Sequence, residues 1–378
     1  MANESLGKPI YLDYNASTPI DSAVAEVMRP LLATAYGNPS SGHWAGAPAR
    51  AVLDQARLSV ATLLGCTPSE IVFTSGGSEA NNLALKGVYF HRADRSPHLI
   101  TSRTEHPAIL APCRFLERLG ATVTYLPVDG HGLVDPDDVR RAVTHETILI
   151  SVMHANNETG TVQPIAEIGK IAAAHGIPLH TDAAQSVGKI TTKVDELGVD
   201  LLSVAGHKMY APKGIGALFV RRGLAVEPLI HGAGHEGGRR AGTESAMLAA
   251  ALGKACELAR IGLEIEPIRT LRDAFWSRLR SAFGDRVVLN GHPERRLPNT
   301  LNVSFRGERG ADLLSKMPDV AASTGSACHT GAASVSPVLE AMSVDREIAA
   351  GAIRFSLGRG TTRDEIEAVV EHLRRLIS

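Results

Sequence analysis

Several features that would define a function class are missing from this sequence. The formal net charge is -1, with 39 basic and 40 acidic residues mixed along the chain, so charge does not favour nucleic acid or an anionic membrane as a partner. No uncharged apolar run reaches the ~18 residues of a membrane span, and the start lacks the basic and apolar parts of a signal peptide. We therefore expect a cytoplasmic protein that binds small molecules or another protein.

Cysteine is scarce as well. The four cysteines, Cys66, Cys113, Cys256 and Cys328, lie far apart and form no Cys-x-x-Cys pair, which argues against a zinc site and a disulfide framework. The first three lie in helical, apolar segments and are expected in the core. Cys328 differs, because the loop 322–334 consists of small residues with two glycines, where a thiol is accessible and can move. A lone loop cysteine is nevertheless usually incidental.

The order of β-rich and helical patterns predicts the fold class. With 378 residues the chain exceeds the usual size of one domain, so two are expected. Up to about residue 220, β-rich runs alternate with helical patterns, which predicts an α/β domain with a mainly parallel sheet. We assign residues 20–262 to this large domain. Its expected strands are 71–74, 98–101, 122–126, 147–152, 177–180, 201–205 and 217–220.

A smaller α+β domain is expected at the C-terminal end. A helical pattern from Glu244 to about Phe283 is interrupted near Pro267, and the domain boundary is placed there. Three strands, 287–289, 300–305 and 352–356, and a closing helix from about Thr362 follow. We assign residues 1–19 and 263–378 to this domain, which therefore includes the Cys328 loop.

The segment 200–216 is the centre of the functional prediction. Residues 201–205 have the apolar content of a buried strand, Gly206 ends it, and His207 and Lys208 follow. An ammonium at an apolar strand end loses hydration, which lowers its pKa and favours the neutral amine that attacks a carbonyl. Lys208 is thus a candidate Schiff-base residue, although a lysine in a loop rich in Gly and Pro is usually just solvated.

Ligands of such sheets bind beyond the carboxyl ends of the strands, so the residues after each run matter most. After 71–74, two glycines lead into a helix that Ser75 or Ser78 could cap. Free amides at that helix start would suit a phosphate, although an ordinary capped helix is equally compatible. No Walker-type Gly-Lys-Ser/Thr is present, which disfavours a nucleoside triphosphate.

Three further strand ends carry polar residues. Pro107 biases His106 away from helical geometry, as suits an imidazole held over a ligand, although a loop histidine is usually solvated. Asn157 lies in a polar cluster that could equally be a turn. Asp182 precedes two alanines that leave room for a flat ring, and a buried carboxylate needs a cation such as a pyridinium nitrogen. The alternative is an aspartate that caps a helix.

Together these strand ends supply what pyridoxal phosphate needs from a protein: a phosphate cradle, a stacking histidine, a carboxylate and a lysine. The segment 232–237 matches the dinucleotide fingerprint by letter, but no amphipathic helix follows, so we reject that interpretation. We expect this loop to reach into a neighbouring subunit instead. Arg354 and Arg359 could each bind a substrate carboxylate or pair on the surface.

Seven motifs occur in order along the chain: Tyr11–Pro19, Gly37–Ser41, Phe73–Glu79, Ala155–Gly160, His180–Gln185, Gly206–Lys208 and Ser326–Cys328. They resemble the NifS/IscS-type cysteine desulfurases of the class V aminotransferase group, and the likeness runs from about residue 10 to 375. The resemblance implies fold-type I architecture, pyridoxal 5'-phosphate as the cofactor, a homodimer, and sulfur supply for iron–sulfur cluster assembly.

The resemblance also implies roles for single residues. Lys208 would carry the cofactor covalently, His106 would stack on its ring and shuttle a proton, and Asp182 would pair with the pyridine nitrogen. Gln185, near Asn157, would contact the phenolic oxygen.

The remaining implied roles concern the phosphate and the substrate. Gly77, Ser78 and His207 would hold the phosphate, and Thr243 would reach it from the other subunit. The implied substrate-binding residues are Arg354, Asn157 and Asn38, and Cys328 would pass sulfur to an acceptor protein.

Two departures from the family pattern bear on this prediction. Many members have a phosphate-binding serine shortly before the lysine, where this chain has Ala205, and Ser203 would point elsewhere in a regular strand. The Cys328-His329 pair and the segment 296–300 resemble the sequences of selenocysteine lyases more than those of the common desulfurases.

We therefore expect a desulfurase that converts L-cysteine to L-alanine and keeps the sulfur on Cys328 as a persulfide. The first alternative is a lyase that converts L-selenocysteine to alanine and selenide. A class V aminotransferase and a non-catalytic scaffold are less favoured.

Overall fold

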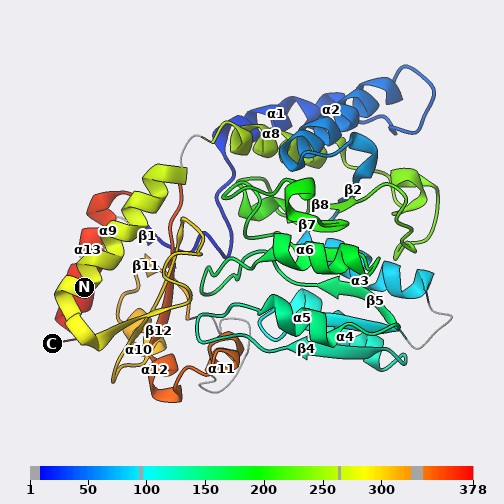
Figure 1. Cartoon of the computed structure of the whole chain (residues 1–378). Coiled ribbons are helices and arrows are strands. Elements are labelled where there is room, and N and C mark those ends of the chain that lie inside the picture. The colour runs from blue at the N-terminus through cyan, green and yellow to red at the C-terminus, as the bar shows by residue number, and fades with distance from the viewer. Residues whose placement is uncertain (1–8, 93–96, 263–264, 325–334, 378) are drawn as a thin grey trace.

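The structure is a computed structural model that describes residues 9–92, 97–262, 265–324 and 335–377. Within these residues the chain forms a seven-stranded sheet flanked by helices, and a smaller unit beside it with a three-stranded sheet (Figure 1). Cys328 and His329 lie outside the described residues. None of the helices in the described ranges combines the length and apolarity that crossing a bilayer requires.

The large sheet has the strand order β2-β8-β7-β6-β5-β3-β4. All its neighbouring strands run parallel except at β8, which is antiparallel to both β2 and β7. The prediction of a mainly parallel sheet is therefore confirmed. The strands are β2 (Ile71–Thr74), β3 (His98–Ser102), β4 (Thr122–Leu126), β5 (Thr147–Ser151), β6 (Leu179–Asp182), β7 (Leu201–Ala205) and β8 (Gly216–Val220).

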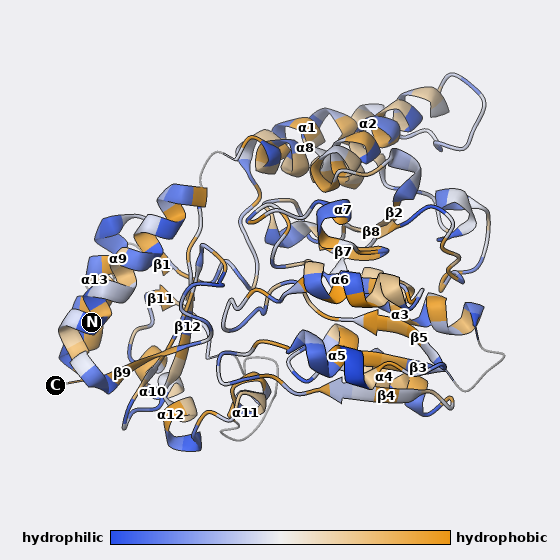
Figure 2. Cartoon of the chain, viewed as in Figure 1, coloured by the Kyte–Doolittle hydropathy of each residue, from blue (hydrophilic) through white to orange (hydrophobic). Residues whose placement is uncertain are grey.

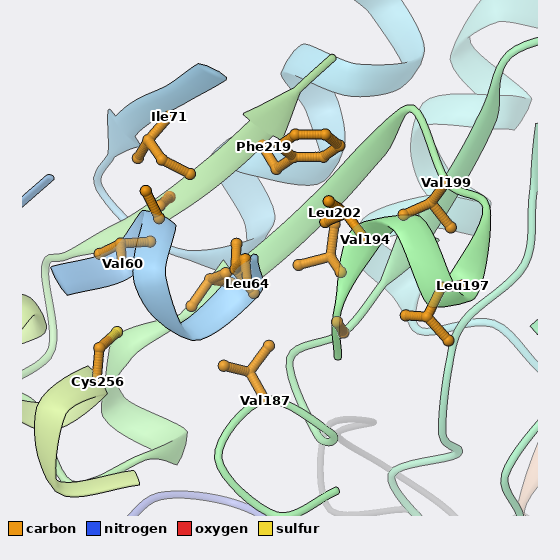
Figure 3. Packing of buried hydrophobic residues seen from close by; sticks show 14 of the residues in the cluster. Val60, Leu64, Ile71, Val187, Val194, Leu197, Val199, Leu202, Phe219 and Cys256 are labelled. Carbon is orange, nitrogen blue, oxygen red and sulfur yellow. The ribbon is translucent and has the colours of Figure 1, made fainter. Parts of the chain in front are cut away.

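Successive residues of strands in this sheet are buried on its opposite faces. In β2, Ile71 and Phe73 belong to one apolar cluster and Val72 to another, and in β7 Leu202 and Leu201 are divided in the same way. On one face, Val60 and Leu64 of α2 lie near Phe219 and Leu202 (Figure 3). On the other face, α3 and α4 cover the strands. Burial on both faces explains why these strands have continuous apolar sequences.

Helices surround the large sheet. The helices α1, α2 and α8 pack together above it in Figure 1. The helices are α1 (Ser22–Thr34), α2 (Gly46–Leu64), α3 (Gly77–His91), α4 (Pro107–Glu117), α5 (Pro136–Ala142), α6 (Ile165–Ala174), α7 (Val194–Leu197) and α8 (Ala246–Arg260). Their outer faces are polar and the strands are mostly apolar, as the hydropathy colouring shows (Figure 2).

The smaller unit has an antiparallel sheet in the order β12-β10-β9. The helices α9 (Ile265–Phe283) and α13 (Arg363–Leu376) share an apolar core with it. The strand β1 (Ile10–Tyr11) pairs with β11 (Val320–Ala321), so β1 lies with this unit. The remaining elements are β9 (Val287–Asn290), β10 (Thr300–Phe305), β12 (Ala352–Ser356), α10 (Gly310–Ser315), α11 (Pro337–Ala341) and α12 (Arg346–Ala350).

Two sequence-based expectations are wrong or shifted. The strand expected at 177–180 is β6, which begins at Leu179, because Pro178 has no N–H for the sheet ladder. Cys66 is not helical: α2 ends at Leu64, Gly65 takes a left-handed conformation with φ 75°, and Cys66 follows, half-buried. Cys113 and Cys256 are helical and buried, as predicted.

Strand β2 lies at one edge of the large sheet, and two side chains bond to its exposed backbone. Arg57 donates to the Ile71 carbonyl oxygen at 2.7 Å, and the Phe73 N–H donates to Glu236 at 2.9 Å. Arg57, which is half-buried, and the buried Glu236 also form an ion pair of 2.6 Å. This ion pair therefore makes hydrogen bonds that a neighbouring strand would otherwise supply, and it attaches the loop around Glu236 to the sheet.

Candidate active site

Lys208 lies in a short 3₁₀ turn, η2 (Gly206–Lys208), directly after β7. Glycine is required at the start of this turn, because a Cβ on Gly206 would lie 2.8 Å from the Ile215 carbonyl oxygen. The Lys208 ammonium donates to the main-chain oxygen of Asn15 at 2.8 Å. The predicted lysine at a strand end is therefore confirmed in position.

Asp182 is the last residue of β6 and is 6% exposed. Its Oδ2 accepts a hydrogen bond from the Asn81 side-chain amide at 2.7 Å, and its Oδ1 accepts one from the Ala184 N–H at 2.9 Å. No helix starts at Asp182, so the helix-capping alternative is wrong, and the Ala184 contact closes a local turn. Among the described residues no cation pairs with this carboxylate, and a buried carboxylate of this kind fits a protonated ring nitrogen.

His106 follows β3 and is the N-cap of α4, with extended backbone angles (φ -62°, ψ 149°) as Pro107 predicts. Its Nδ1 accepts a hydrogen bond from the Ala108 N–H at 3.0 Å, so in the neutral ring the proton is on Nε2. Burial lowers the pKa of His106, while the charge of Asp182 opposes this shift and that of Lys208 adds to it. His106, Asp182 and Lys208 are thus close enough to influence one another, and the imidazole is neutral at pH 7.

The helix start after β2 differs from the prediction. The N-cap of α3 is Gly76, and no side chain caps the helix, so the expectation that Ser75 or Ser78 caps it is wrong. The Ser75 N–H donates instead to Glu79 at 2.7 Å, and Ser78 is exposed. A helix start without a side-chain cap retains amides that can bind a phosphate.

Ala205 faces this helix start. A Cβ on Gly77 would lie 3.1 Å from the Ala205 Cβ, so the two positions are in close approach. Ser203 points elsewhere, as expected, and its Oγ lies 3.0 Å from Nε2 of the buried His180. Small residues on both sides leave the α3 amides accessible, but this position supplies no hydroxyl.

The structure also places His207 and Thr243. His207 approaches Ser17 at 3.3 Å, and burial, followed by the charges of Lys208 and Lys213, lowers the pKa of His207 to about 4. Thr243 is exposed and lines a cavity of about 180 Å³ together with Ser75.

Asn38 lies in the connection between α1 and α2, is exposed, and accepts a hydrogen bond from the Ser40 N–H. In the described part of the chain, no hydrogen bond joins Asn38 or Thr243 to the other candidate residues.

Arg354, on β12, joins the smaller unit to the site. It is 6% exposed, pairs with Asp13 at 2.7 Å and donates to the Asn157 carbonyl oxygen at 2.9 Å. Its Nε is buried and has no partner among the described residues, which leaves one donor for a ligand. Arg359 is engaged elsewhere, because it pairs with Asp21 at 2.8 Å.

Asn15 is a residue of the site that sequence reasoning missed. It is 0% exposed, and its main-chain oxygen accepts from both Lys208 and the Gln185 side-chain amide, at 2.8 and 2.9 Å. Its own amide donates to Thr300 at 2.9 Å. The motif that contains Asn15 was noted in the sequence, but nothing local in it indicates contacts across 170 residues.

Glu105, Asn81 and Lys189 were also missed. Glu105 accepts hydrogen bonds from Ser102 and the Met153 N–H at 2.7 and 2.8 Å, and burial raises its pKa to about 8. No sequence signal separates such buried polar residues from surface ones.

The described ends of the segment that carries Cys328 lie beside this site. Ser323 pairs through its backbone with Arg354, and Ser336 donates to Glu158 at 2.5 Å. Burial raises the pKa of Glu158 to about 7. The described residues on both sides of 325–334 are therefore attached to residues next to Asn157.

The donor set fits pyridoxal phosphate. A helix start without a side-chain cap, a neutral histidine, a buried carboxylate with no cation partner among the described residues, and a lysine occupy neighbouring strand ends. Each matches one part of that cofactor: phosphate, ring face, ring nitrogen and aldehyde.

Comparisons with known proteins agree with this chemistry. The family described as Aminotransferase class-V matches residues 10–369. A cysteine desulfurase IscS of Dictyoglomus turgidum is 48% identical over 374 residues, which cover 98% of this chain and 95% of that protein. A cysteine desulfurase IscS of Pectobacterium carotovorum is 46% identical over 98% of this chain and 93% of that protein.

Solved structures are similar over nearly the whole chain. A NifS-like protein has a TM-score of 0.90 at 35% identity and covers 98% of this chain and 99% of its own. The structure described as SspA in complex with cysteine has a TM-score of 0.83 at 40% identity, with 92% and 98% covered.

Proposed function

This chain belongs to the aminotransferase class-V family, and from that premise we propose how its residues divide the work of a cysteine desulfurase. Its architecture is fold-type I, as the motifs predicted, and the enzyme depends on pyridoxal phosphate. It converts L-cysteine to L-alanine, and the relatives favour this activity over the selenocysteine lyase alternative. The observation that carries the proposal is the convergence of Lys208, Asp182 and His106 at neighbouring strand ends.

Three residues act on the reacting centre. When bound, pyridoxal phosphate supplies an electron sink for the substrate Cα. Lys208 would hold the cofactor through its aldehyde, and its amine, when free, would remove the substrate Cα proton. Asp182 keeps the ring nitrogen protonated, because that proton is the counter-charge of a buried carboxylate. His106 moves a proton through Nε2, a step worth about 10² to 10⁴ in rate.

Cys328 receives the sulfur. Its thiolate attacks the substrate sulfur, an S–S bond forms as the Cβ–S bond breaks, and the electron pair left on Cβ takes up a proton to give alanine. The other three thiols are unsuited to this step, because burial raises the pKa of Cys66 and Cys113 to about 12 and raises that of Cys256 further. The persulfide then passes to an acceptor protein that serves iron–sulfur cluster assembly.

The remaining roles concern binding. Arg354 holds the substrate carboxylate, supported by its Nε, which has no partner in the described part of the chain, and Asn157 and Asn38 contact the substrate. Gln185 contacts the ring oxygen, and Gly77, Ser78 and His207 hold the phosphate. The enzyme is a cytoplasmic homodimer in which Thr243 reaches the phosphate of the other subunit. Residues 20–262 form the domain that binds the cofactor, and residues 1–19 and 263–378 form the domain that carries Cys328.

Borohydride reduction followed by peptide mapping tests the cofactor assignment. We expect a pyridoxyl group on the Lys208 peptide, and its absence there would refute the proposed chemistry. Alanine and sulfide are then measured together after addition of L-cysteine and a reductant. A stoichiometric keto acid without sulfide would identify an aminotransferase instead.

The variant Cys328→Ala tests the sulfur step. We expect it to lose nearly all turnover of L-cysteine, while the control Cys66→Ala keeps wild-type turnover because its thiol is protonated at neutral pH. Full L-cysteine turnover by Cys328→Ala would contradict the role of Cys328. If the variant also retains L-selenocysteine turnover, selenium leaves without a protein carrier.

A further inference from the structure

A second lysine lies next to Lys208 and has no part in the chemistry proposed above. Lys189 follows the turn after Asp182, and its Nζ donates to the Gln185 Oε1 at 3.0 Å and to the Asn15 Oδ1 at 3.4 Å. It lines a cavity of about 50 Å³ together with Lys208. The residue is half-buried as a whole, but protein atoms enclose its ammonium.

The position of this ammonium is electrostatically unfavourable. Burial, followed by the charges of Lys208 and Arg354, lowers the pKa of Lys189 to about 7. Other charged groups nearby are already paired, since Arg354 bonds to Asp13 and Arg359, on the same cavity, bonds to Asp21. No carboxylate among the described residues forms an ion pair with Lys189. A lysine amine enclosed there, with no carboxylate partner among the described residues, indicates a use for its hydrogen bonds.

Those hydrogen bonds determine which way two amides face. A side-chain amide has one acceptor oxygen and one donor nitrogen, and its two orientations differ by exchange of these atoms. The Gln185 oxygen faces Lys189, and one N–H of its nitrogen donates to the Asn15 main-chain oxygen at 2.9 Å. The nitrogen carries a second hydrogen, which remains for a ligand. In the reversed orientation the Gln185 oxygen would face the Asn15 oxygen, and both would be acceptors.

Lys189 and Asn299 fix the Asn15 side chain in the same way. Both donate to its Oδ1, at 3.4 and 3.0 Å, so that its nitrogen donates to Thr300 and to the Asn157 carbonyl oxygen. The main-chain oxygen of Asn15 is the acceptor for Lys208. Lys189 therefore bonds to Asn15, which accepts a hydrogen bond from Lys208, and to Gln185, which is assigned to the ring oxygen of the cofactor.

We propose that Lys189 is a positioning residue that holds the amides of Gln185 and Asn15 so that Gln185 presents an N–H to the ring oxygen of the cofactor. This inference rests on the proposed function, because the ring oxygen belongs to pyridoxal phosphate. Lys189 does not touch the reacting atoms and takes no proton from the substrate.

The variant Lys189→Met tests this role, since it keeps the length of the side chain but removes its hydrogen-bond donor and charge. Loss of the N–H at the ring oxygen favours protonation of the nitrogen that joins Lys208 to the cofactor. We expect the pH midpoint of the visible absorbance change to rise by about 0.5 to 1 unit. We expect the Kd of the apoprotein for pyridoxal phosphate to rise about tenfold.

Two controls separate positioning from folding. Lys170→Met makes the same chemical change on the exposed surface of α6 and should leave both measurements at wild-type values. Lys189→Arg keeps charge and donors, the adjoining cavity gives it room, and it should restore the wild-type midpoint. If Lys189→Met does not fold, Lys189→Leu, which also lacks a hydrogen-bond donor and a charge, is measured in its place against the same criteria.

The outcomes are distinguishable from a failure of the proposed function. If wild-type Lys208 carries the cofactor but the midpoint and Kd of Lys189→Met equal those of wild type, the positioning role is wrong and the proposed function stands. An equal change in Lys170→Met also overturns it. If borohydride reduction places no pyridoxyl group on wild-type Lys208, the proposed function itself fails.

Discussion

The two sides of Lys208 are built differently. On the α3 side, the start of α3 and the small residues Gly77 and Ala205 leave main-chain amides accessible. On the Asn15 side, the long polar side chains of Gln185 and Lys189 bond to Asn15, and that of Arg354 bonds to the Asn157 carbonyl oxygen, so segments far apart in the sequence meet there.

The two sides differ in how many residues of the sequence must be in place to form them. A site made of main-chain amides needs a helix start and small neighbouring side chains. Both can be recognised in one short sequence motif. A side-chain network needs every member in place, because each buried polar group that loses its partner costs free energy. Substitutions should therefore be tolerated on the α3 side and damaging on the Asn15 side.

The largest effect is expected from Asn15→Ala. Removal of the side chain leaves buried donors and acceptors on Asn299, Thr300 and the Asn157 carbonyl without one partner. We expect the free energy of unfolding in urea to fall by about 3 kcal/mol. The control Asn82→Ala, on the α3 side, loses a hydrogen bond to the Ser78 carbonyl and should cost less than about 1 kcal/mol. Equal losses would remove the contrast.

Asp182→Asn should have the next largest effect. The change removes the charge that pairs with the ring nitrogen but keeps the shape of the side chain, so we expect the Kd for pyridoxal phosphate to rise about 100-fold. Asp200→Asn is the matched control, because Asp200 lies just before β7, at the end remote from Lys208, and pairs with Arg221. A similar rise in that control would show that the effect is not specific to the site.

A third test concerns pH. The pKa of Glu105 is raised to about 8 by burial, so the folded chain binds more protons at this group than the unfolded chain between about pH 4.5 and 8. The stability it contributes is present below pH 4.5 and is lost as pH rises through 8, by at most ~1.4 kcal/mol per pH unit. In Glu105→Gln that part of the pH dependence should disappear.

Unfolding free energies at pH 5, 6, 7 and 8 provide the measurement. Glu117→Gln, which alters an exposed carboxylate that bonds to Tyr125, should keep the wild-type profile. A profile for Glu105→Gln that matches wild type would contradict the assignment.

The smallest effect is expected on the α3 side. Ser78→Ala should change the free energy of unfolding by less than about 0.5 kcal/mol, because Ser78 is exposed and does not cap α3. Thr362→Ala removes a true cap, since the Thr362 hydroxyl accepts from the Glu365 N–H, and should cost about 1 kcal/mol. If Ser78→Ala costs as much, the serine caps the helix after all.

The same contrast explains what the sequence predicts. The run 201–205 is strand β7, and Pro107 placed His106 correctly, because apolar runs and proline act on their immediate neighbours. The cap of α3 was mispredicted, because Ser75, Gly76 and Ser78 all suit a helix start and only the backbone path selects among them.

Residues whose role depends on distant partners gave no sequence signal. Lys189 looks like any lysine after a turn that ends in glycine, and its enclosure depends on Asn15, 174 residues away. Asn81 lies on α3, where an amide is often exposed, yet its side chain bonds to Asp182 at the end of β6. Periodicity reports which face of an element is buried, but not which buried polar groups meet.

The ion pair of Arg57 and Glu236 at the border of the large sheet has a consequence for self-association. A border strand with open N–H and C=O groups is a template onto which a strand of another molecule can add. At β2, side chains already bond to Ile71 and Phe73, so an incoming strand meets charges in place of open peptide groups. This arrangement protects concentrated or newly synthesised chains from aggregation through that border.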